Sequence, residues 1–108
     1  MAEQIIGRKE LYTVPAPGAD TDIFTKISPK DGVYAWRVTV ALTVSSVFNV
    51  SATDGTTAHI WGLNASAALN AADVYTFEHA VDPDVSYSYQ VETDGIVEML
   101  TVDELVSE

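Results

Sequence analysis

The stretch "DVSYSYQVETDG", residues 84–95, decides the fold because its side chains alternate between apolar and polar. Val85, Tyr87, Tyr89 and Val91 fall on one side of an extended chain, and serine, glutamine and glutamate side chains fall on the other. A period of two residues is typical of a β-strand that buries one face. We therefore expect the two tyrosines to lie chiefly in a core, with hydroxyls that reach polar partners near its rim.

The rest of the chain repeats this pattern. Residues 36–44 alternate in the same way, and Asp54-Gly55 is a strong hairpin signal because both residues readily adopt a positive φ. Residues 96–106 are apolar on both parities, which predicts a strand that is central or at an interface. Strands at intervals of about ten residues, without a long helical period, predict an all-β fold, a single antiparallel β-sandwich of immunoglobulin-like or jelly-roll topology.

The first 21 residues differ from this pattern. They end in "PAPGADT", where Pro15 and Pro17 lack N–H donors and Gly18 permits a turn. We therefore expect residues 1–21 to form an extended N-terminal arm with a stiff linker, and residues 22–108 to form the β-sandwich domain. The length of 108 residues suits one domain, and the absence of cysteine leaves packing alone to hold it together.

Charge is distributed unevenly along the chain. The net charge is −11, yet all five Lys and Arg residues lie within the first 37 residues. Nucleic acids and anionic membranes are therefore improbable partners, because both are bound largely through basic side chains. In concentrated salt the Debye length falls to about 3 Å, so that close carboxylates repel one another weakly. We hypothesise a halophilic source; the alternative is an ordinary acidic, soluble protein.

No catalytic or metal-binding motif is evident. His59 and His79 are the two histidines, and neither has a metal-ligand spacing. There is no cysteine nucleophile and no serine in a nucleophile elbow. Asp82 and Asp84 are more typical of a solvated turn than of a calcium site. The sequence therefore predicts a protein that is not an enzyme and needs no cofactor or metal, in which His79 is a hydrogen-bonded packing residue.

The short run "HIW" at residues 59–61 carries the one indication of a small ligand. If Ile60 points inward, His59 and Trp61 point outward, where an indole ring can stack on the face of a sugar. Two alternatives remain. Either the strand parity is the reverse, or Trp61 covers a sheet edge or a subunit contact.

Taken together, the "VTV" strand at 38–40, the "LNAADVYTF" loop and strand at 69–77, the "YSYQ" strand at 87–90 and the closing "LTVDEL" at 100–105 resemble small β-sandwich virion proteins of tailed phages and archaeal tailed viruses. In particular, the chain resembles capsid decoration, or cement, proteins. The resemblance implies a homo-oligomer that trimerises or otherwise clusters on the outer capsid surface and bridges subunits of the major capsid protein.

The arm fits such a role, because its apolar side chains can lie on a neighbouring subunit and become ordered on contact. These candidate contact residues are Ile5, Ile6, Leu11 and Tyr12. The alternative is a disordered terminus. The leading hypothesis is thus a non-enzymatic virion structural protein, and the alternative is a carbohydrate-binding or adhesin-like β-sandwich of a turret, fibre or tail that uses Trp61.

Overall fold

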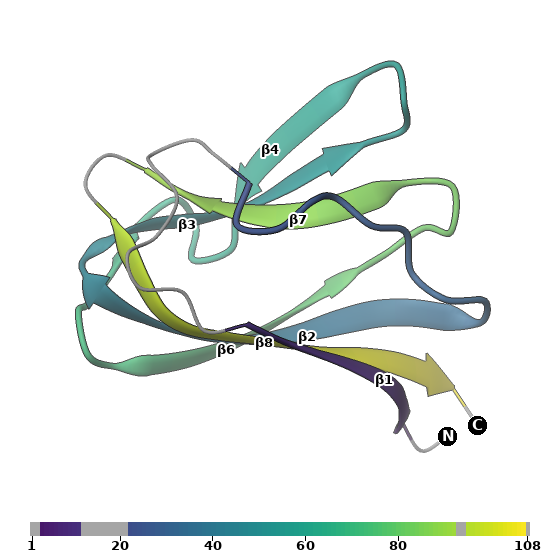
Figure 1. Cartoon of the computed structure of the whole chain (residues 1–108), viewed down its shortest axis with the longest axis horizontal. Coiled ribbons are helices and arrows are strands. Elements are labelled where there is room, and N and C mark those ends of the chain that lie inside the picture. The colour runs from purple at the N-terminus through teal and green to yellow at the C-terminus, as the bar shows by residue number, and fades with distance from the viewer. Residues whose placement is uncertain (1–2, 12–21, 93–94, 108) are drawn as a thin grey trace.

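The computed structural model describes residues 3–11, 22–92 and 95–107, and these form an all-β sandwich of two antiparallel sheets (Figure 1). One sheet has the strand order β1-β8-β2-β6, and in the other β3 lies between β7 on one side and β4 and β5 on the other. The predicted β-sandwich is confirmed. The strands are β1 (Glu3–Leu11), β2 (Val33–Val44), β3 (Ser46–Thr53), β4 (Ala58–Gly62), β5 (Ala68–Leu69), β6 (Val74–Ala80), β7 (Ser86–Val91) and β8 (Ile96–Ser107).

The alternating side chains make the core between the sheets, as the sequence predicts. From β2, Trp36 and Val38 are fully buried, and from β7, Tyr89 and Val91 are fully buried. The ring of Tyr89 stacks on Phe48 of β3, with ring centroids 5.3 Å apart. Full burial of such a side chain stabilises the fold by about 1.5–3 kcal/mol. The two periodic stretches therefore face each other across the core, where the ring of Trp36 contacts those of Tyr87 and Tyr89.

The strand β8 is central in its sheet, with β1 on one side and β2 on the other. This confirms the expectation from its two apolar parities. The turn signal "TDG" at residues 93–95 predicts a hairpin, and this prediction is wrong, because β7 pairs with β3 whereas β8 pairs with β1 and β2. The connection therefore passes from one sheet to the other. Thr93 and Asp94 themselves lie outside the described residues.

The N-terminal residues differ from the predicted arm. Glu3–Leu11 is a strand, β1, which runs antiparallel to β8 along the edge of its sheet. The pairing aligns Ile5 with Leu105 and Leu11 with Leu100. Residues 3–11 are therefore part of the sandwich, because pairing with a distant strand satisfies the backbone hydrogen-bonding groups that face β8. The linker at residues 12–21 lies outside the described residues.

The hairpin between β3 and β4 forms where the sequence predicts it. The Asp54 carboxylate accepts hydrogen bonds from the backbone N–H groups of Thr56 and Thr57, at 2.8 and 2.7 Å, and Gly55 adopts a φ of 95°. Hydrogen bonds from the backbone of Thr57 and then Thr56 lower the pKa of Asp54. The tip of this hairpin projects away from the other sheet (Figure 1).

A buried carboxylate fixes the turn that precedes β2. Glu104 of β8 is fully buried and lies opposite Trp36 in the register. Its Oε2 accepts a hydrogen bond from the backbone N–H of Lys30 at 3.0 Å, and its Oε1 lies 4.0 Å from the Lys30 ammonium. A buried carboxylate requires such partners, so Glu104 binds this turn to the end of the core.

Candidate interaction surface

A cluster of aromatic rings extends from the core to the side of the sandwich where β4 and β6 lie. His79 of β6 is at its centre, with ring centroids 6.2 Å from Trp36 and 5.8 Å from Tyr87 in the core. On the other side, the ring of Trp61 meets His79 edge to face, also at 6.2 Å. His79 therefore links the exposed indole of β4 to the buried indole of β2.

Hydrogen bonds define the state of this histidine. The Nε2 atom of His79 lies 2.7 Å from the hydroxyl of Tyr89, and its Nδ1 lies 3.1 Å from the carbonyl oxygen of Ala80. A carbonyl can only accept, so Nδ1 carries the proton and Nε2 accepts from Tyr89. Burial lowers the pKa of His79 and raises the pKa of Tyr89. The pair is thus held neutral, and His79 is a packing residue as expected.

The side-chain directions on β4 correct the prediction made for "HIW". The register pairs Trp61 with Val50, which is buried, and Ile60 with Ser51, which lies on the opposite parity of β3. Ile60 is 56% exposed and Trp61 39% exposed. The expectation that Ile60 points into the core was therefore wrong. His59 shares the parity of Trp61 and is also exposed.

Large apolar side chains are exposed on the same part of the molecule. We refer to strands β4 and β6, with Tyr34 beside the end of β6, as the β4–β6 side. Tyr34 belongs to it because its carbonyl accepts a hydrogen bond from the N–H of Val81, directly after β6. Among residues 22–92 and 95–106, whose side chains the structure describes, the exposed large apolar residues all belong to this side: Tyr34, Ile60, Trp61 and Val74. The sequence indicated exposure only for Trp61, because the exposure of the other three side chains depends on how the strands pair.

A hollow on this side is lined by residues from two neighbouring strands, including Tyr34, Glu78 and His79. The carboxylate of Glu78 accepts hydrogen bonds from the guanidinium of Arg37, with the Nη2 atom at 3.0 Å. Within residues 3–11, 22–92 and 95–107, no three His, Asp or Glu side chains gather closely enough to hold a metal ion. The hollow can accept a side chain, and its one carboxylate already has a cationic partner.

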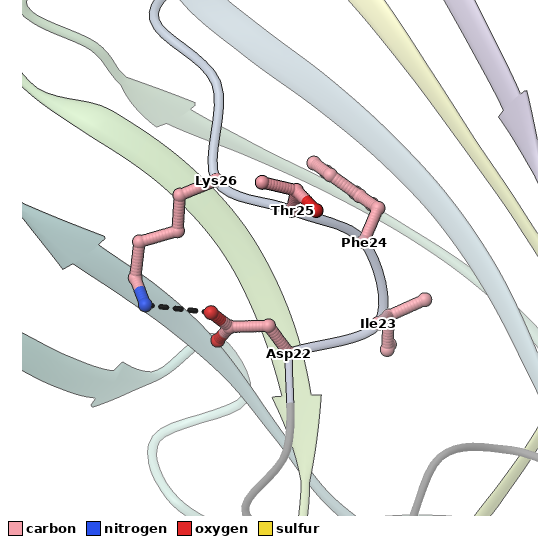
Figure 2. Close-up of a pocket in the computed structure, with 5 residues that line it drawn as sticks. All are labelled: Asp22, Ile23, Phe24, Thr25 and Lys26. Atoms are coloured by element: carbon pink, nitrogen blue, oxygen red, sulfur yellow. Dashed lines mark hydrogen bonds and ion pairs between the residues drawn. The ribbon is translucent and has the colours of Figure 1, made fainter.

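A second hollow borders the segment Asp22–Lys26, which Figure 2 shows. The Asp22 carboxylate accepts hydrogen bonds from the ammonium of Lys26 at 2.6 Å and from the side-chain amide of Gln90 at 2.8 Å. Burial raises the pKa of Asp22, but the hydrogen bonds from Lys26, Gln90 and Ser51 outweigh it and leave this pKa lowered. These contacts bind the segment to β7, so we assign it a structural role.

The other predicted contact residues are not brought to the β4–β6 side. Ile5, Ile6 and Leu11 belong to β1, on the opposite edge of its sheet from β6. Tyr12 lies outside the described residues. The predicted contact residues of the N-terminus and the exposed indole therefore belong to different edges of the sandwich.

Comparison with known proteins adds no relative: no family model matches the chain, and no curated protein or solved structure is significantly similar to it. In the described parts of the chain, no helix has the length and apolar character needed to cross a membrane.

Proposed function

We propose that this chain is a non-enzymatic structural protein of a virion, a capsid decoration protein that binds the outer capsid surface. In this role it stabilises the shell by bridging neighbouring subunits of the major capsid protein, as a homo-oligomer, most simply a trimer. The observation that supports the proposal best is the exposure of large apolar side chains on or beside β4 and β6, in a protein with a net charge of −11. Exposed apolar surface, where it is extensive, marks sites of contact with other proteins.

The position of β1 decides how this proposal is tested. Deletion of the N-terminal residues would remove a strand that pairs with β8, and loss of binding would then report unfolding. Substitutions that leave both sheets intact are preferable. Trp61→Ser removes an exposed ring from β4, and Thr43→Ser changes an exposed residue of β2 as a matched control.

The experiment is co-sedimentation with capsids assembled from the major capsid protein of the same genome, in dilute buffer and in multimolar salt. We expect the chain to sediment with the shells, to raise their temperature of disruption, and to do so as an oligomer by light scattering. Trp61→Ser should bind more weakly, and Thr43→Ser should bind like the parent. A folded chain that fails to sediment with capsids at every salt concentration would overturn the proposal.

A specific observation also favours a second function, carbohydrate binding. Trp61 and His59 lie on the same face of β4 and are both exposed, which is the arrangement that a sugar-stacking platform needs. Trp36 is fully buried, so a change in tryptophan emission on adding a glycan would report Trp61. Retention on immobilised glycans, lost in Trp61→Ser and accompanied by no capsid binding, would favour this function over decoration.

A further inference from the structure

The outer backbone edge of β4 has no partner strand within the described residues. The N–H of Leu63 donates to the carbonyl of Phe48 of β3, and the carbonyl of Thr57 accepts from Asp54. Hydrogen-bonding direction alternates along an antiparallel strand, so the odd-numbered residues of β4 face β3. The N–H and C=O groups of Ala58, Ile60 and Gly62 therefore point away from the sheet.

This edge lacks the features that usually prevent strand addition. Natural edge strands carry charges, proline or bulges, or are covered by another segment. The strand β4, with the sequence "AHIWG", has no Lys, Arg, Asp, Glu or Pro, and its register with β3 is continuous. On the opposite edge of the same sheet, the segment that contains Ile23 and Ile27 covers β7 through backbone hydrogen bonds of 2.8–3.0 Å.

Charge specifies the kind of segment that this edge can receive. Residues 38–108 contain no Lys or Arg, and the carboxylate of Asp54 lies at the tip of the hairpin that leads into β4. A second copy of the chain would bring the same excess of carboxylates. A segment with basic side chains would instead meet a complementary field.

We propose that the open edge of β4 binds an extended segment of another protein in which basic and apolar residues alternate, by adding that segment as a strand. The backbone groups of Ala58, Ile60 and Gly62 supply the ladder. The apolar side chains of the added strand lie against Trp61, and its basic side chains lie in the negative field of a chain whose net charge is −11. This inference goes beyond the proposed function, since it holds for any partner that offers such a segment.

The test uses the full chain and a synthetic peptide in which Lys and Val alternate, with amide exchange followed residue by residue by NMR. We expect the peptide to protect the amides of Ala58, Ile60 and Gly62 and to leave the amides that already face β3 unchanged. A peptide with Glu in place of Lys should bind about tenfold more weakly or worse, and added salt should reduce the difference.

Two variants separate backbone addition from side-chain contact. Ile60→Pro removes an outward N–H, which an edge strand tolerates, and should weaken peptide binding by about tenfold or more. Ile60→Thr keeps that N–H and should bind nearly as the parent does. Equal binding by Ile60→Pro, or equal binding of the Glu peptide, would overturn the proposal. Self-association that protects these amides without peptide would overturn it in favour of a second copy.

The result is separable from capsid binding. A chain that sediments with capsids but shows no protection at β4 keeps the proposed function and loses this inference. A chain that binds the Lys and Val peptide at β4 but does not sediment with capsids keeps this inference and loses the proposed function.

Discussion

Replacement of Tyr89 by phenylalanine removes one oxygen from the centre of the molecule and changes little else. The Tyr89 ring stacks on Phe48 and meets Phe24 edge to face, and both contacts remain in the variant. What is lost is the hydrogen bond of 2.7 Å to Nε2 of His79, which is then left without a donor in a largely buried position. A buried acceptor without its partner costs about 1–3 kcal/mol of the free energy of unfolding.

For a domain of this size that loss corresponds to a fall of about 5–15 °C in the melting temperature. The assay is thermal and urea unfolding at neutral pH, followed by far-ultraviolet circular dichroism. Tyr75→Phe is the matched control, because the Tyr75 hydroxyl accepts a hydrogen bond from the N–H of Asn70 at an exposed position where water can replace it. It should cost less than about 1 kcal/mol. Equal stability of Tyr89→Phe and Tyr75→Phe would refute the role assigned to the buried hydroxyl.

Three further predictions follow from the described contacts. Burial holds the pKa of His79 below its usual 6.5, so the unfolded chain takes up a proton first as the pH falls. This contribution to the free energy of unfolding is full above about pH 6.5 and is lost as the pH falls through the lowered pKa. Urea titrations should show a smaller pH dependence in His79→Gln than in the parent, and an unchanged pH dependence would contradict this reasoning. Glu104→Ala should cost about 2–5 kcal/mol in chemical unfolding, and Glu104→Gln clearly less because it keeps an acceptor for the Lys30 N–H; equal losses would contradict this. The net charge of −11 predicts a melting temperature that rises from dilute buffer to multimolar salt, and a flat profile would reject the halophilic hypothesis.

The core was predictable because its signal is local. Alternation in residues 36–44 and 85–91 depends only on neighbouring residues, and burial of one face follows directly from it. The turn at Asp54-Gly55 is equally local, since few residues adopt the positive φ found at Gly55. In both cases the residues that determine the local structure are neighbours in the sequence.

The arm and the face of β4 were not predictable because their causes are distant in the sequence. Residues 3–11 become a strand through pairing with β8, almost a whole chain length away, which no short-range pattern reveals. In "AHIWG" the alternation is compatible with burial of either set of side chains. Only the pairing of Ile60 with Ser51 places the isoleucine outside the core. Burial of the polar side of β7 has the same origin, because the N–H of Phe24 donates to Ser88 across the fold.

Attachment to the capsid surface would be visible in an electron cryomicroscopy reconstruction of capsids mixed with the full chain. We expect added density outside the shell that the two-layered sandwich fits, at positions that span neighbouring subunits of the major capsid protein, with the β4–β6 side at a contact. Shells without added density, or density confined to a tail, fibre or turret, would contradict a decoration protein.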